Sequence, residues 1–154
     1  MGEHADIVDN SLLYTNTKAG YSLEYPKNWQ YDDSSFGNPA IFYDPVALEY
    51  LDSNNLIAGS KIEIYYEPTN LVNVKDAKST SEIGEKIITE NDIILNGHSA
   101  VRKELEGRLG YSNLFYFVND EKLFTIVQHV AKKDALEEYS KYFDDIIETF
   151  KFTD

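Results

Sequence analysis

Histidine is the side chain best suited to proton transfer near neutral pH, and the chain has three. His129 follows Thr125 and Val127 on one face of an expected strand, where a lone imidazole can act as a general base. A half-buried, hydrogen-bonded structural histidine is the commoner outcome at such a position. His4 lies in a polar N-terminal stretch and His98 follows an Asn-Gly turn, so both are expected to be solvated. An enzyme using His129 with a nearby carboxylate is therefore a minor alternative.

The sequence offers no recognisable nucleophile or phosphate-binding motif. It contains no cysteine, and no serine stands in a Gly-x-Ser-x-Gly elbow. Ser112 and Ser140 have no evident partner in the sequence. Glycine-rich phosphate loops and His-x-x-x-His zinc spacing are both absent. We therefore expect no catalytic residues, no enzyme activity and no cofactor.

Acidic residues between positions 32 and 44 form the best candidate for a cation site. Asp32, Asp33 and Asp44 could supply carboxylate oxygens, the ligands that calcium prefers. An EF-hand loop starting at Asp32 fails, because Phe36 and Tyr43 stand where oxygen ligands are needed. The same acids are common turn formers and solubilising groups, which is the favoured interpretation. Small-ligand or divalent-cation binding is kept as an alternative function.

Tyrosines on the expected strands indicate a protein-binding surface, because exposed tyrosine is enriched at protein contacts. Tyr65 is predicted on the outward face of its strand, beside Glu67, and Tyr43 ends an earlier strand just before Asp44. An alternative is that Tyr65 only covers the sheet beneath a helix. We take Tyr43, Asp44, Tyr65 and Glu67 as the candidate partner-binding residues.

Composition limits the class of protein further. The 154 residues carry a net charge of −13, which disfavours binding to nucleic acid. They include 12 tyrosines, 8 phenylalanines and 1 tryptophan, which is too much apolar surface for a disordered chain. The length suits one domain over residues 13–154, after a flexible polar lead-in over residues 1–12. No run approaches the roughly 18 apolar residues that a membrane span needs, and no signal peptide is evident.

Alternating apolar residues predict an antiparallel sheet. Asn96-Gly97 is the dipeptide favoured in type I′ turns, so it predicts a hairpin between the residues on either side. A second hairpin is expected around residues 119–122. The expected strands cover residues 14–18, 21–25, 40–43, 61–67, 99–106, 111–118 and 123–131.

Two helices are expected beside this sheet. Residues 76–89 carry a patchy apolar stripe, and residues 134–150 carry a continuous one at spacings of three and four. Strands 111–118 and 123–131 are apolar on both faces, so both faces of the sheet need cover. The predicted class is α+β, an antiparallel β-sheet sandwiched between helices in an α/β/α sandwich.

The order of motifs resembles the PsbP-like family. Residues 14–29 resemble its opening, with Gly20-Tyr21-Ser22, Tyr25-Pro26 and Trp29 as marks, and Phe42-Tyr43-Asp44-Pro45 resembles its Phe-x-Asp-Pro strand end. The later hairpins and a closing helix that ends in Phe150-Lys151-Phe152 also fit. The similarity extends from about Tyr14 to Phe152 and rests on structural motifs.

The resemblance implies an antiparallel sheet between helices and a role without catalysis. Members of the family include extrinsic photosystem subunits, lipoprotein-like proteins and a nuclear import factor that binds the Ran GTPase. The family has no set of catalytic residues to carry over, and the docking features of plant photosystem subunits are not matched here. We therefore expect a non-catalytic binding or assembly module with a protein partner. We expect it to act outside the cytoplasm or at a membrane through a removed signal, and otherwise in the cytoplasm.

Overall fold

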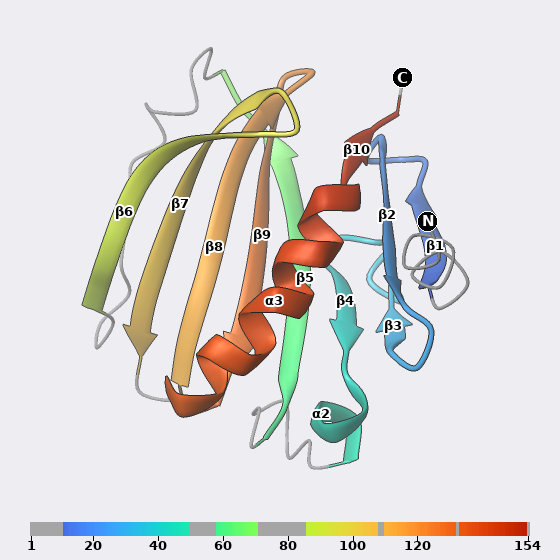
Figure 1. Cartoon of the computed structure of the whole chain (residues 1–154). Coiled ribbons are helices and arrows are strands. Elements are labelled where there is room, and N and C mark those ends of the chain that lie inside the picture. The colour runs from blue at the N-terminus through green and yellow to red at the C-terminus, as the bar shows by residue number, and fades with distance from the viewer. Residues whose placement is uncertain (1–10, 50–57, 71–85, 108–109, 132, 154) are drawn as a thin grey trace, which may run out of the picture.

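A computed structural model describes residues 11–49, 58–70, 86–107, 110–131 and 133–153. These residues form two antiparallel sheets (Figure 1). The larger sheet has seven strands in the order β3-β4-β5-β9-β8-β7-β6, and the smaller sheet has the order β1-β2-β10. Their bounds are β1 Ser11–Asn16, β2 Tyr21–Pro26, β3 Gln30–Asp32, β4 Ala40–Tyr43, β5 Ser60–Pro68, β6 Lys86–Leu95, β7 His98–Gly107, β8 Gly110–Asn119, β9 Lys122–Val130 and β10 Lys151–Phe152.

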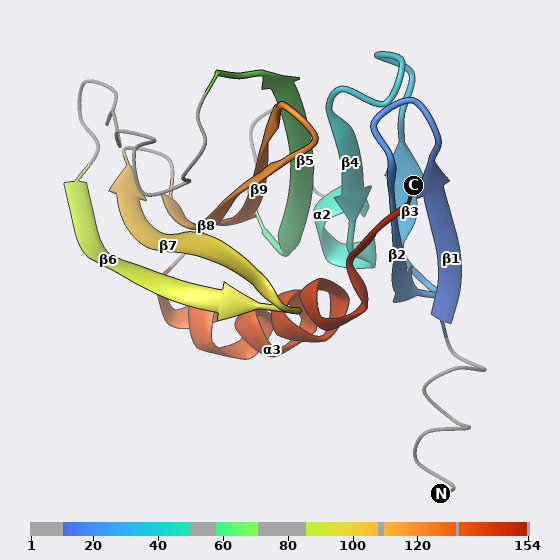
Figure 2. The same ribbon diagram turned by 90° about the horizontal axis from the view of Figure 1, so that it is seen from above.

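One long helix, α3 (Lys133–Thr149), crosses the concave face of the larger sheet (Figures 1 and 2). Its buried residues Phe143, Ile146 and Ile147 lie on the apolar stripe expected from the sequence. They pack against alternating apolar residues of β8 and β9, including Phe115 and Ile126. The stripe therefore fixes which face of the sheet the helix covers.

An aromatic cluster joins the helix to both sheets. Phe150, directly after α3, stacks on Tyr21 of β2 with ring centroids 5.1 Å apart, and on Phe117 of β8 at 5.8 Å. Phe124 of β9 and Phe152 of β10 complete the cluster. Rings of this size bury large apolar areas, so the cluster is a major part of the core.

The Asn96-Gly97 turn links the hairpin β6–β7 to the end of α3. Both residues have positive φ angles, 52° and 81°, as a type I′ turn requires. The Asn96 amide also donates to the Ile147 and Phe150 carbonyl oxygens, at 2.9 and 3.0 Å. The predicted hairpin is confirmed, and its turn satisfies carbonyls that the helix leaves without intrahelical donors.

The prediction of an α/β/α sandwich is wrong in one respect, because the fold is richer in sheet. Residues 86–89, assigned from the sequence to a helix over 76–89, belong to β6. The rest of that predicted helix lies outside the described residues. A register shift between Ile87 and Thr89 interrupts the pairing of β6, so this end of the strand lacks the alternating pattern that would have marked it in the sequence.

The remaining predicted strands are confirmed with small shifts at their ends. The first strand begins at Ser11 and ends at Asn16, so Ser11 and Leu12 of the expected lead-in lie in β1. A short helix, α2 (Pro45–Glu49), follows β4. None of the described helices is long and apolar enough to cross a membrane.

Candidate functional site

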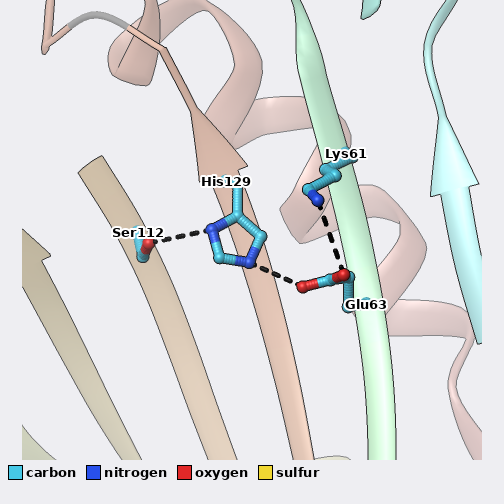
Figure 3. Close-up of polar contacts among 4 residues, drawn as sticks. All are labelled: Lys61, Glu63, Ser112 and His129. Carbon is cyan, nitrogen blue, oxygen red and sulfur yellow. Dashed lines mark hydrogen bonds and ion pairs between the residues drawn. The ribbon is translucent and has the colours of Figure 1, made fainter. Parts of the chain in front are cut away.

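A line of polar side chains crosses the face of the larger sheet that is opposite α3. His129 of β9 pairs with Lys61 of β5 on one side and with Ser112 of β8 on the other. Glu63 lies two residues along β5, and strand alternation therefore puts it on the same face. Figure 3 shows all four side chains reaching toward one another from three neighbouring strands.

These four residues form a continuous polar chain. His129 Nε2 lies 2.7 Å from Glu63 Oε1, and His129 Nδ1 lies 3.2 Å from Ser112 Oγ (Figure 3). Lys61 Nζ lies 3.5 Å from the second carboxylate oxygen of Glu63. Only 11% of the Glu63 side chain is exposed, against 34% for His129. Both oxygens of a nearly buried carboxylate are thus matched by partners.

The neighbours of Glu63 decide its charge. Burial alone would raise the pKa of the Glu63 carboxyl, but the hydrogen bond and charge of His129, with help from Lys61, hold it below its usual value. Burial, together with the nearby Glu63, raises the pKa of Tyr65 to about 12. Burial, Asp32 and Glu63 raise that of Tyr43. The ionised acid is therefore flanked by two neutral phenols.

The order Ser112–His129–Glu63 resembles the hydrogen-bond chain of a serine hydrolase. A hydrolase also needs free donors beside the nucleophile for the developing oxyanion. Ser112 lies inside β8, paired with Leu105 of β7 and with His129. The strands β7 and β9 pair with β8 on both sides, so the backbone of β8 at Ser112 offers no free N–H group to an oxyanion. This geometry favours a structural role for the three side chains, and it does not favour acyl transfer.

Ser112 had no evident partner in the sequence, but the structure places its hydroxyl beside His129, and the sequence held a signal for this contact. A two-residue turn at Asp120-Glu121 fixes the register of the hairpin β8–β9. That register places Ser112 opposite His129. The contact of His129 with β5 had no such local signal, because β5 is distant in the sequence.

Three of the four predicted partner-binding residues share the outer face of the larger sheet. Tyr43 pairs with Lys61, and Tyr65 and Glu67 follow Glu63 along β5 at alternate positions. Tyr65 is 38% exposed.

Asp44 lies apart from these three and is buried. Its carboxylate accepts hydrogen bonds from the Ala47 and Ser60 backbone N–H groups, at 2.8 and 3.2 Å. Pro45 follows as the first residue of α2, the arrangement typical of a helix N-cap. The Asp44 carboxylate therefore binds backbone N–H groups of its own chain.

The three acids considered for a cation are dispersed. The exposed Asp32 accepts from the Ser34 N–H at 2.8 Å, and Asp33 accepts from the Tyr14 hydroxyl at 3.3 Å. Asp44 lies beyond the opposite end of β4, since Asp32 pairs with Ile41. Among the described residues, no three or more His, Asp or Glu side chains are grouped so that they could hold a metal ion.

Comparison with known proteins supports the fold. No protein-family model matches the chain, and no curated protein matches it. A solved structure of cyanobacterial PsbP from Synechocystis is similar, with a TM-score of 0.65 and 15% identity over 93% of this chain and 92% of that one. The chain has the PsbP-like fold.

Two further structures carry the PsbP-like fold at low identity. The Ran-binding protein Mog1p of Saccharomyces cerevisiae has a TM-score of 0.58 and 10% identity, over 94% of this chain and 96% of its own. A Pseudomonas aeruginosa protein of unknown function has a TM-score of 0.53 and 16% identity, over 91% and 95%. The resemblance noted in the sequence is thus confirmed at the level of fold.

Proposed function

We propose that this protein is a non-catalytic module that binds another protein through the outer face of the larger sheet. The observation that carries the proposal is the position of Tyr65 and Glu67 beside the Lys61–Glu63–His129–Ser112 chain. Tyr65 is a partly exposed aromatic side chain, the type enriched at protein contacts. Mog1p, with the same fold, is described as a Ran-binding protein, which supports a binding role.

The rigidity of this face favours binding over chemistry. Glu63 is held by His129 at 2.7 Å, and the strands beneath are paired along their length. A surface ordered before contact loses less conformational entropy when a partner binds. The tyrosine and carboxylate side chains then add apolar area and hydrogen-bonding groups at fixed positions.

A pair of tyrosine variants tests the proposal. Tyr65 and Tyr142 are both 38% exposed, but Tyr65 lies on β5 and Tyr142 on α3. We expect a partner enriched from native extract by the wild-type protein to bind Tyr65→Ala at least tenfold more weakly. We expect Tyr142→Ala to bind it like the wild type.

The measurement is quantitative mass spectrometry of proteins retained by each immobilised variant, followed by calorimetric titration of the purified partner. Glu67→Ala should weaken the same complex and reduce its salt dependence, because it removes a surface charge. Equal affinity for wild type and Tyr65→Ala, or no specific partner, would refute the proposal.

We extend the proposal to location: the protein acts outside the cytoplasm. This extension rests on the resemblance to a family with extrinsic and lipoprotein-like members. Fractionation of native cells with an antibody to the protein tests it. Recovery only in the cytoplasmic fraction would contradict the location and leave the binding proposal standing.

A further inference from the structure

The loop between β3 and β4 presents one phenylalanine to solvent. Phe36 is 85% exposed, the highest exposure among the described large apolar side chains. Its backbone φ is 61°, in the left-handed region that costs a non-glycine residue energy. Neither burial nor backbone preference explains a phenylalanine here, so its side chain contributes little to folding beyond a contact with Lys18.

The loop is nevertheless well fixed on both sides of Phe36. Asn38 exchanges two hydrogen bonds with the Tyr66 backbone of β5, at 2.9 and 3.0 Å. The buried Asn16 of β1 donates to the Gly37 carbonyl at 3.0 Å. A Cβ at Gly37 would lie 2.5 Å from the Asn16 amide nitrogen, so the close approach requires glycine. These hydrogen bonds therefore fix the loop backbone in a conformation that exposes the Phe36 ring to solvent.

The charges around Phe36 indicate what the ring meets. Asp32 and Asp33 precede it and are exposed, within a chain of net charge −13. Lys18 lies over the ring, with its Nζ 5.9 Å from the centroid, so one positive charge stands against these two carboxylates and the balance is negative. Anionic lipid would repel the two carboxylates and the chain as a whole, and a second copy of this chain would repel it too. A cationic rim would attract them.

We propose that Phe36 is an anchor that inserts into an apolar pocket on a second protein, with basic residues around that pocket. The aromatic ring supplies buried apolar area, and Asp32 and Asp33 face the cationic rim. This contact is separate from the Tyr65 surface, and goes beyond the function proposed above. Because Asn38 binds the end of β5, the support of the loop is continuous with that strand.

Unfolding experiments separate a binding role from a structural one. Phe36→Gly and Phe36→Asn suit a positive φ better than phenylalanine does. We expect the thermal unfolding midpoint of both variants to lie between that of the wild type and about 4 °C above it. A midpoint lowered by more than about 4 °C would show that the ring serves the fold, and would overturn the proposal.

Photo-crosslinking identifies the occupant. A benzoylphenylalanine placed at position 36 in native cells is expected to capture one protein, while the same group at the 78% exposed Ile94 of β6 does not. The captured protein, once purified, should bind Phe36→Ala at least about tenfold more weakly than wild type. It should bind Ile94→Ala unchanged, and its affinity should fall with added salt.

The remaining outcomes overturn the proposal. These are lipid adducts at position 36, adducts to a second copy of the chain, capture no different from that at position 94, or unchanged affinity for Phe36→Ala. Tyr65→Ala distinguishes the two surfaces. If the protein captured at position 36 loses affinity with Tyr65→Ala but not with Phe36→Ala, it binds the sheet face and the anchor is refuted. If it loses affinity with Phe36→Ala but not with Tyr65→Ala, the anchor is supported and the sheet face keeps its own test.

Discussion

Glu63 shows how one carboxylate links two neighbouring strands, β5 and β9. Its pKa is held below the ordinary value of 4.5, so folding favours the ionised form. The resulting stabilisation is complete above the unfolded-state pKa and is lost as the pH falls through the lower folded-state value. We expect Glu63→Gln to lower the unfolding free energy by about 1–2 kcal/mol near pH 7. The deficit should shrink toward about pH 3.5.

Urea unfolding of both proteins at the two pH values measures this difference. Glu67→Gln is the matched control, because Glu67 is an exposed carboxyl on the same strand. It should change stability by less than about 0.5 kcal/mol. A Glu63→Gln deficit that stays constant with pH would show that the contacts of Glu63 do not depend on its charge.

Asp44 gives a second prediction at the scale of the residue. Its carboxylate caps α2 and also accepts from Ser60, so Asp44→Ala should cost about 2 kcal/mol. Asp44→Asn keeps an oxygen acceptor and should cost less. Asp32→Ala is the control, because Asp32 also accepts a backbone N–H but is exposed. Chemical unfolding without added metal measures all three; an unchanged Asp44→Ala would contradict the capping role.

At the scale of elements, the best test is the contact between the β6–β7 turn and α3. Asn96→Asp loses both amide donors and sets a negative charge near the helix C-terminus, so it should cost about 2 kcal/mol. Asn96→Gly also loses the donors but suits the φ of 52°, so it should cost about 1 kcal/mol.

The β8–β9 turn supplies the control for this pair. Asp120 has a φ of 51°, and its side chain pairs with Lys122 of the same hairpin. Asp120→Gly should therefore leave the unfolding free energy within about 0.5 kcal/mol of wild type. If Asn96→Asp and Asn96→Gly both stay within about 0.5 kcal/mol of wild type in urea unfolding, a role for the amide donors is contradicted.

Sequence patterns predicted the elements that are specified by residues close together in the chain, such as tight turns and amphipathic helices. The Asn-Gly dipeptide marked the β6–β7 turn, and the stripe of Phe143, Ile146 and Ile147 marked the face of α3. The register shift after Ile87 defeated the pattern of β6, because one extra residue breaks a period of two. The same limit applies to the site: Ser112 and His129 share a hairpin, whereas Glu63 reaches His129 only through long-range pairing.

Over the whole molecule, the order of strands depends in part on pairings that no local pattern encodes. The central pair β5–β9 joins residues more than 50 positions apart, as the pairing of Pro68 with Lys122 shows. The resemblance to a known family therefore carried more information about topology than periodicity did. The chain is strongly acidic, and aromatic packing across the two sheets explains why it folds nonetheless. Its 12 tyrosines and 8 phenylalanines supply the rings for that packing.

The aromatic cluster predicts how the two sheets unfold. Phe150 is 3% exposed and stacks on Tyr21 of the smaller sheet and Phe117 of the larger one. Phe150→Ala should cost about 4 kcal/mol through lost burial and a cavity, and Phe150→Leu should cost less. Because both sheets share this core, we expect each variant to unfold in one transition. Fluorescence of Trp29, the single tryptophan, and far-ultraviolet circular dichroism should coincide. Two separated transitions in Phe150→Ala would mean that the smaller sheet unfolds independently.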